Sequence, residues 1–314
     1  MSTRRTFIKQ AGLLSAYSTY GEPTNPITES GSDADPKQRK WPDGSRLVVS
    51  ISMQFESGGQ PENAESPFPD NMQSGFRDFP ATTWYEYGYK EGIPRMLDNW
   101  DELGIKVTSH MVGGAVLKNP ALAREIVSRG HEAAAHGMNW RSQYNMQYQE
   151  EKTFIKDGAD AIRRTTGMTP VGYNANWLRR GENTLIILKE LGFKYHIDDL
   201  SRDEPFLTRI KGDALAVIPY TIRCNDIVLI EGKNFSVDQF AEQVKTEFNQ
   251  LYKEGAVRRR QMSVSFHDRI GGTPQMVKTV YKLVKYMQQH EGVRFMTKNE
   301  IADIVLADPN ALED

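Results

Sequence analysis

Short apolar runs, many of them β-branched, alternate along the chain with longer segments of helical periodicity. The runs predict buried strands and lie at 46–53, 104–109, 131–136, 193–197, 216–220, 227–230, 261–266 and 293–296. The segments with one apolar helical face predict helices, the longest at 87–103, 150–166, 237–254 and 276–291. Such β–α alternation is typical of a parallel sheet flanked by helices. Seven or eight units predict an α/β fold, a distorted (β/α)7-8 barrel.

The two ends of the chain differ in polarity. Residues 1–40 are rich in Ser, Thr, Gly and Pro and have no hydrophobic period, so we expect a flexible tail. Residues 41–314 show no break in composition, so we expect one catalytic domain. The segment TRRTFIK at 3–9 resembles the twin-arginine export motif and precedes a short apolar stretch. It predicts a periplasmic or exported protein; the alternative is a plain basic terminus and a cytoplasmic location.

Composition excludes several classes of function. The net charge is -2 and both signs are scattered, which argues against a nucleic-acid partner. No stretch approaches the roughly 20 apolar residues that span a bilayer, so no membrane partner is expected. The single cysteine, Cys224, rules out an internal disulfide and a cysteine-based zinc site.

Polar side chains follow most of the predicted strands. In α/β barrels the chemistry lies at the carboxyl ends of the strands, and the residues there are Gln54, Glu56, His110, His136, Asn174, Asp198, Asn225, Asp226, His267 and Asp268. The loop at 56–82 is long for a compact domain, which usually indicates function. Several titratable groups at one rim predict acid–base catalysis.

Three segments resemble the motifs of polysaccharide deacetylases. GHEAAAHG at 130–137 resembles the second motif, in which a Gly-His-Glu strand leads to a metal-binding histidine. His267 and Asp268 resemble the late motif, and 51–56 lies where the family has its Asp-containing first motif. The resemblance covers roughly 41–300. It implies that 41–314 is a barrel of the polysaccharide-deacetylase type.

The departures from that pattern concern the metal. Metal-dependent members have two Asp where this chain has Gln54 and Glu56, and a His where it has Trp140. An amide and an indole are poor ligands for a divalent cation, so we expect no metal ligands and no cofactor. Zinc is expected only if the protein is instead a metal-dependent N-deacetylase.

One branch of the superfamily, the metal-independent allantoinases, resembles this chain in the same changes. The matching stretches are 54–59, 131–140, 218–221 with 225–226, and 263–269. The tract at 173–180 does not match well. The resemblance implies a hydrolase of a non-peptide amide C–N bond, acting on a small-molecule amide such as allantoin or a cyclic imide. Relatives in this branch also suggest a homo-oligomer.

The expected catalytic residues are Glu56, His136, His267 and Asp268. Glu56 is the candidate base, with a pKa raised by burial. His136 is its partner or a hydrogen-bonding group for the substrate, and His267 is the candidate general acid. Asp268 either orients His267 or caps the following loop.

The expected substrate-binding residues are Gln54, Trp140, Tyr173, Asn174, Asp198, Tyr220, Asn225 and Asp226. For Trp140 the alternative is core packing, and for Asn225 and Asp226 it is a turn. Two other functions stay open: a metal-dependent N-deacetylase of envelope or chitin-type polysaccharide, and a catalytically inactive barrel that binds glycans.

Overall fold

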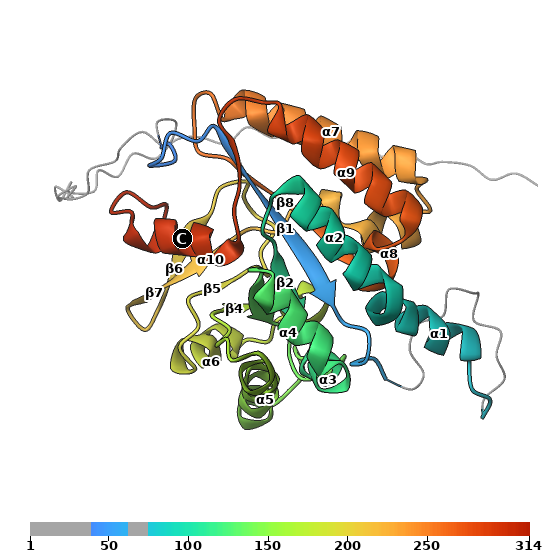
Figure 1. Ribbon diagram of the computed structural model, residues 1–314. Coiled ribbons are helices and arrows are strands. Elements are labelled where there is room, and N and C mark those ends of the chain that lie inside the picture. Colours follow the sequence, from blue (N-terminus) through green and yellow to red (C-terminus); the bar gives the residue numbers. More distant parts are fainter. Residues whose placement is uncertain (1–38, 62–74) are drawn as a thin grey trace, which may run out of the picture. The chain divides into compact units, whose positions relative to one another are not determined.

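One curled, mostly parallel sheet organises the computed structural model, which describes residues 39–61 and 75–314 (Figure 1). Within these residues the strand order is β6-β7-β5-β4-β3-β2-β1-β8, and β9 pairs with β1. The strands are β1 (Leu47–Phe55), β2 (Thr108–Met111), β3 (Glu132–Ala135), β4 (Gly172–Tyr173), β5 (Tyr195–His196), β6 (Phe206–Ile210), β7 (Asp213–Val217), β8 (Gln261–His267) and β9 (Val293–Phe295). The predicted distorted barrel is confirmed. The predicted export motif at 3–9 lies outside the described residues.

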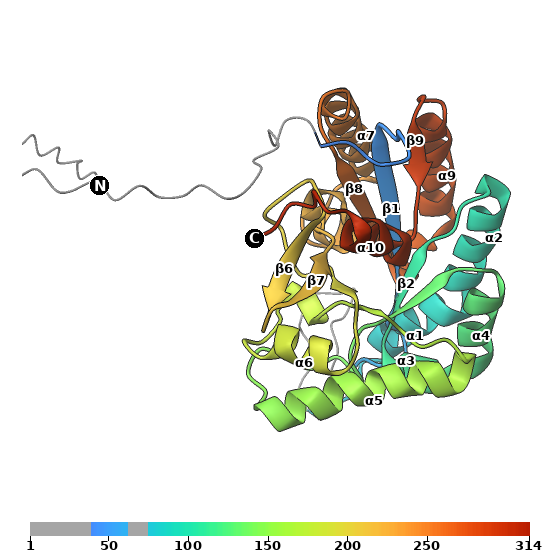
Figure 2. The same cartoon turned by 90° about the vertical axis from the view of Figure 1, so that its left-hand side faces the viewer.

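Helices cover the outer face of the sheet, as Figure 2 shows for α9, α2, α4 and α5 around β1. The helices are α1 (Phe79–Tyr87), α2 (Ile93–Leu103), α3 (Gly113–Lys118), α4 (Pro120–Ser128), α5 (Tyr148–Thr166), α6 (Thr184–Glu190), α7 (Val237–Glu254), α8 (Asp268–Gly271), α9 (Pro274–Gln288) and α10 (Lys298–Ala307). In the parts of the chain that the structure covers, no helix combines the length and the apolarity that crossing a membrane requires.

The alternation of residues along β1 explains where the polar groups go. Successive side chains of a strand point to opposite faces. Val49, Ile51, Met53 and Phe55 lie in the hydrophobic core under the helices, and the positions between them face the other way. Those positions are polar and buried: Ser50, Ser52 and Gln54, followed by Glu56 beyond the strand end.

β8 repeats this pattern beside β1. The two strands pair in parallel with Ser50 opposite Ser263, Ser52 opposite Ser265, and Gln54 opposite His267. The inner face of both strands is therefore polar as far as their carboxyl ends. The interior also holds Lys298, whose ammonium donates to the hydroxyls of Ser50 and Ser263.

The apolar run at 227–230, predicted as a strand, is instead a π-helical turn, Ile227–Glu231. A short apolar run does not by itself distinguish the two structures. Here the side chains of Asn225 and Asp226 accept hydrogen bonds from the amide of Ile227 and so begin a helical turn. The antiparallel pairing of β6 with β7 and the helices α1, α3 and α10 were also not predicted.

Candidate active site

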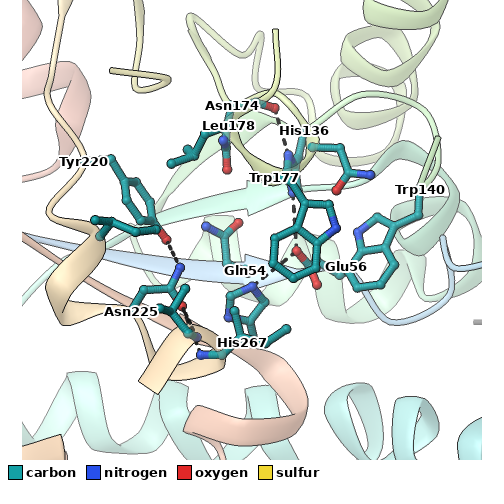
Figure 3. A pocket seen from close by; sticks show the side chains of 14 residues that line it. Gln54, Glu56, His136, Trp140, Asn174, Trp177, Leu178, Tyr220, Asn225 and His267 are labelled. Carbon is teal, nitrogen blue, oxygen red and sulfur yellow. Dashed lines mark hydrogen bonds and ion pairs between the residues drawn. The ribbon is translucent and has the colours of Figure 1, made fainter. Parts of the chain in front are cut away.

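A pocket opens at the carboxyl ends of the strands and encloses about 440 Å³, counted out to its open mouth. Eight of the residues expected at the site line it: Gln54, Glu56, His136, Trp140, Asn174, Tyr220, Asn225 and His267. They come from segments up to 213 residues apart, and Figure 3 shows them converging on one space. The carboxylate and the two imidazoles are at most 6% exposed. The pocket therefore brings together the groups that the strand ends predicted.

Glu56 lies at the centre of the buried charges. Its Oε1 is 3.3 Å from Nε2 of His136 and 3.6 Å from Nε2 of His267. Its Oε2 accepts a hydrogen bond of 3.0 Å from Nη1 of Arg269. One carboxylate oxygen thus faces both imidazoles, and the other is held by a permanent cation (Figure 3 draws the contacts among the pocket residues).

The partners of the two Nδ1 atoms fix the orientation of the imidazoles. Nδ1 of His136 lies 2.8 Å from the carbonyl oxygen of Asn174, and Nδ1 of His267 lies 2.6 Å from Oδ1 of Asp226. Both partners are pure acceptors, so both Nδ1 atoms carry hydrogen and donate it. Each ring therefore presents Nε2 to the pocket, where a proton can be taken up or released.

The charges of this cluster set the protonation of Glu56 and His267. Burial alone would raise the pKa of Glu56, but the neighbouring cations, above all His267 and then Arg269, lower it to about 2. The expectation of a raised pKa for Glu56 is therefore wrong. Burial lowers the pKa of His267, but Glu56 and Asp226 outweigh this and raise the pKa above its ordinary value. The pair favours a carboxylate beside an imidazolium.

Arg269 is a member of the site to which the sequence assigned no role. Its guanidinium is 1% exposed and lies over the rings of Trp84, Tyr85 and Trp140, at 4.9, 4.6 and 5.1 Å from their centres. Such cation–π contacts stabilise a cation most where water is excluded. Trp140 therefore both lines the pocket and covers the guanidinium that holds Glu56. No pattern in the sequence predicts that a buried arginine is surrounded by three aromatic rings, so Arg269 could not be identified from the sequence.

Asp268 and Asp226 take different places from those expected. Asp268 accepts hydrogen bonds from the amides of Glu56 and Ser57, at 3.0 and 2.8 Å, so it fixes the loop after β1. The carboxylate bonded to His267 belongs to Asp226, which is fully buried. Asp226 therefore orients His267 and, contrary to the expectation that it binds substrate, does not line the pocket. Of the two roles expected for Asp268, orienting His267 is wrong, and its carboxylate binds the loop after β1 instead of capping the loop that follows it.

The segment after β8, which contains Asp268 and Arg269, packs closely against the outer helix layer. The π-helical turn Gly88–Gly92 packs on Asp268 so closely that a Cβ at Gly92 would lie 1.9 Å from the backbone oxygen of Asp268. A Cβ at Gly88 would lie 2.7 Å from the carboxyl group of the same residue. π-Helical turns often occur at functional sites. This one makes room for the segment that carries Asp268 and Arg269.

Tyr173 and Asp198, both expected to bind substrate, do not line the pocket. The hydroxyl of Tyr173 donates to Oε1 of Gln143 at 2.6 Å, on the side of the strand opposite to Asn174. Asp198 accepts from Nδ2 of Asn174 at 2.9 Å and from the amide of Ala175, so it anchors the chain behind the pocket. Burial raises the pKa of Asp198 to about 7.

Tyr220, Asn225 and Gln54 form the polar side of the pocket away from Glu56. Nδ2 of Asn225 donates to the hydroxyl of Tyr220 at 2.7 Å, and the side chains of Ser265 and Gln54 also interact with this hydroxyl. Oε1 of Gln54 is buried and has no hydrogen-bond partner among the described residues. A buried acceptor of this kind requires a donor.

The donor set does not fit the divalent metal that the resemblance associates with deacetylases. Both imidazole Nε2 atoms point at one oxygen of Glu56, and the other oxygen is already paired with Arg269. A guanidinium at this distance repels a second cation. Within residues 39–61 and 75–314, no three His, Cys, Asp or Glu side chains are grouped so that they could hold an ion.

The outer wall of the pocket was not predicted. It consists of Asn176, Trp177, Leu178, Ile222, Ile227 and Val228. These residues follow strand ends in loops or short helical turns, where apolar side chains carry no periodic signal. The mismatch of 173–180 with the allantoinase pattern was the one hint that this wall differs.

The chain is similar in sequence and fold to known proteins. Residues 78–196 match the polysaccharide deacetylase family. A peptidoglycan deacetylase of Helicobacter pylori is 26% identical over 245 residues, which are 68% of this chain and 83% of that protein. A probable polysaccharide deacetylase from Pseudomonas aeruginosa PAO1 is 28% identical with a TM-score of 0.77, over 84% of this chain and 92% of that one.

The structure is also similar to that of PuuE allantoinase. The TM-score is 0.80 at 27% identity, and the alignment covers 91% of this chain and 99% of the allantoinase. The structural likenesses agree with the curled sheet, and the family match includes the motif at 130–137. Residues 78–196 thus match the polysaccharide deacetylase family, and the fold of the chain is similar to that of PuuE allantoinase.

Proposed function

We propose that this protein hydrolyses a non-peptide amide C–N bond, in a cyclic amide, ureide or imide, without a metal ion. The observation that carries the proposal is the arrangement of two imidazoles around one ionised carboxylate. Nε2 of His136 and Nε2 of His267 face the same oxygen of Glu56. Such a triad supplies the proton transfers that amide hydrolysis requires.

The two imidazoles differ in their partners, and this difference suggests their roles. His267 has a carboxylate at Nδ1 and a raised pKa, so it enters the reaction as the imidazolium. His136 has an uncharged carbonyl at Nδ1. The charged partner of His267 and the uncharged partner of His136 therefore suggest that His267 is the acid and His136 the base.

The proposed reaction begins with a water molecule bound at Glu56. Glu56 holds a water molecule with its carboxylate, and Nε2 of His136 takes one proton of that water as its oxygen bonds to the amide carbon. The Tyr220 O–H donates to the carbonyl oxygen, which becomes negative. The C–N bond breaks as Nε2 of His267 gives its proton to the nitrogen. A proton returned from His136 to His267 through Glu56 and solvent restores the site.

The names of relatives support a second candidate, N-deacetylation of a sugar. The Helicobacter pylori relative is a peptidoglycan deacetylase, and an acetamide is also an amide C–N bond. The absence of a fitting donor set among the described residues weighs against the metal-dependent form of that reaction.

One assay separates the candidates. The purified protein is incubated with hydantoins, cyclic imides and N-acetylglucosamine oligomers, with and without a strong chelator, and its metal content is measured. We expect the protein to hydrolyse a cyclic amide at a rate that the chelator does not change. The rate should fall by at least about 10³-fold in Glu56→Gln and in His267→Ala. Activity on the oligomers that disappears on chelation and returns with zinc would instead establish the deacetylase.

A further inference from the structure

The pocket has a polar floor and an apolar rim. Its ionised groups, Glu56 and His267, lie at the floor with Arg269 behind them. The rim is formed by Trp177, Leu178, Ile222, Ile227 and Val228, and Asn176 is the polar side chain among them. The two parts of the pocket therefore select for different chemistry on one substrate.

Trp177 is the most exposed part of this rim. Its side chain is 49% exposed although it lines the pocket. Of the large hydrophobic residues that the structure finds exposed, it is the one that belongs to this pocket. In Figure 3 its indole lies with Trp140 on the side of Glu56 and His136, across the pocket from Tyr220.

The backbone at this point is held in an unusual conformation. Trp177 has φ 55° and Leu178 has φ 59°, both in the left-handed region. Bulky residues rarely adopt it, because the Cβ atom comes too close to the following carbonyl oxygen. Such conformations persist where surrounding contacts impose them, and they gather at binding sites.

The anchor for this conformation lies directly before it. The carboxylate of Asp198 accepts from the amide of Ala175 with both oxygens, at 2.9 and 3.0 Å, and also binds the side chain of Asn174. The amide of Leu178 then donates to the carbonyl of Ala175 at 2.9 Å. The fold thus fixes the start of the loop, and the two residues that follow turn their side chains to the pocket.

A polar substituent has few partners at this rim. A hydroxyl or a ureido group placed there without hydrogen bonds is unfavourable. An apolar substituent is favoured instead, because it is removed from water against apolar side chains. The rim therefore favours a substrate that is polar at its amide and apolar at its other end.

We propose that the substrate of this protein is a cyclic amide or imide whose ring carries an apolar, preferably aromatic, substituent, and that Trp177 and Leu178 determine this specificity. The inference rests on the proposed amide hydrolysis. The ring amide faces Glu56, His136 and His267, and the substituent packs against Trp177 and Leu178. The tract 173–180, which departs from the allantoinase pattern, contains both specificity residues.

A series with one constant ring tests this directly. Hydantoin, 5-benzylhydantoin and allantoin, which is 5-ureidohydantoin, share the scissile ring and differ in a hydrogen, an apolar group and a polar group. We expect kcat/KM for 5-benzylhydantoin to exceed that for each of the others by at least about tenfold.

Three variants locate the cause. Trp177→Gly removes the indole at a backbone position that glycine adopts without cost, so the protein should fold; the ratio of kcat/KM between 5-benzylhydantoin and hydantoin should fall about tenfold. Trp177→Phe should keep part of the ratio. Leu200→Ala is the control, because Leu200 is 54% exposed and does not line the pocket; its ratio should equal that of the wild type.

The outcomes of these assays distinguish a failure of the proposed substrate specificity from a failure of the proposed amide hydrolysis. Hydrolysis of hydantoin with an equal or higher kcat/KM for allantoin, or a ratio unchanged in Trp177→Gly, overturns the assignment of an apolar substituent and leaves the amide hydrolase standing. Failure to hydrolyse any of the three rings overturns the hydrolysis of cyclic amides, and the substrate class falls with it.

Discussion

Nδ1 of His267 and Oδ1 of Asp226 meet at 2.6 Å across 41 residues of sequence. The other oxygen of Asp226 accepts the backbone amide of His267 at 2.7 Å, so one carboxylate holds both the ring and the main chain of this histidine. The imidazole therefore has one orientation and one tautomer. Both are requirements for a group that must deliver a proton to a fixed point.

Asp226→Asn is expected to lower kcat by about 10²–10⁴-fold, because proton donation by an oriented imidazole contributes that much. Asp226 helps to raise the pKa of His267. Removal of this charge lowers the pKa of His267, so the imidazole loses its proton at a lower pH. The alkaline limb of the kcat/KM profile therefore shifts to lower pH. The pH–rate profile measures this. Asp303→Asn, at an exposed salt bridge with Lys194, is the control. An alkaline limb that stays in place would show that His267 is not the acid.

Arg269→Met is expected to move the acidic limb of the same profile in the opposite direction. The charge of Arg269 lowers the pKa of Glu56, so its loss raises that pKa and Glu56 becomes protonated at a higher pH. Breaking a buried pair also destabilises by about 3–5 kcal/mol, so thermal unfolding is measured first. Arg269→Lys keeps the charge and should leave the acidic limb near its wild-type position, while the flat contact with the three rings is lost. An acidic limb unmoved in folded Arg269→Met contradicts the role given to Arg269.

The positions of the groups that follow a regular strand could be predicted from the sequence, because the alternation of side chains along a strand assigns each of them to one face of the sheet. Glu56, His136 and His267 follow β1, β3 and β8 and meet as expected. The sequence was not sufficient for the groups that support them. Asp268 is the neighbour of His267 in sequence, but neighbouring side chains diverge, and the actual partner lies in another loop. Neither spacing nor composition encodes that contact.

Tyr173→Phe tests a residue that the sequence placed at the site and the structure places behind it. The lost hydrogen bond to Gln143 is expected to reduce the free energy of unfolding by about 1 kcal/mol. KM should stay at the wild-type value, because the hydroxyl does not reach the pocket. Urea unfolding and steady-state kinetics measure the two effects. A raised KM with unchanged stability would return Tyr173 to the binding site.

Lys298→Met is expected to change how stability depends on pH. Burial lowers the pKa of Lys298 to about 7, against an offset from Glu132. Between pH 7 and the unfolded pKa near 10.4, the unfolded state binds more protons than the folded one, so the wild type gains stability as pH rises. The variant lacks this gain. Its stability relative to the wild type should fall by on the order of 2–3 kcal/mol between pH 7 and pH 9.5.

Urea unfolding at the two pH values provides this measurement. Lys233→Met is the matched control, because Lys233 is solvent-exposed and its replacement should add no pH dependence. A constant difference between wild type and Lys298→Met across this range would mean that Lys298 is charged in the fold as it is in water.

The alternation along β1 ties the register of the sheet to the chemistry. The strand places Met53 and Phe55 under the helices and aims Gln54 and Glu56 at the pocket. Deleting or inserting a single residue within Leu47–Phe55 would exchange the two sets, sending a carboxylate into the helix layer and a phenyl ring to the imidazoles. One such event would disrupt both the hydrophobic core and the catalytic pocket. Insertions and deletions among descendants of this protein should therefore occur in the loops and not in this strand.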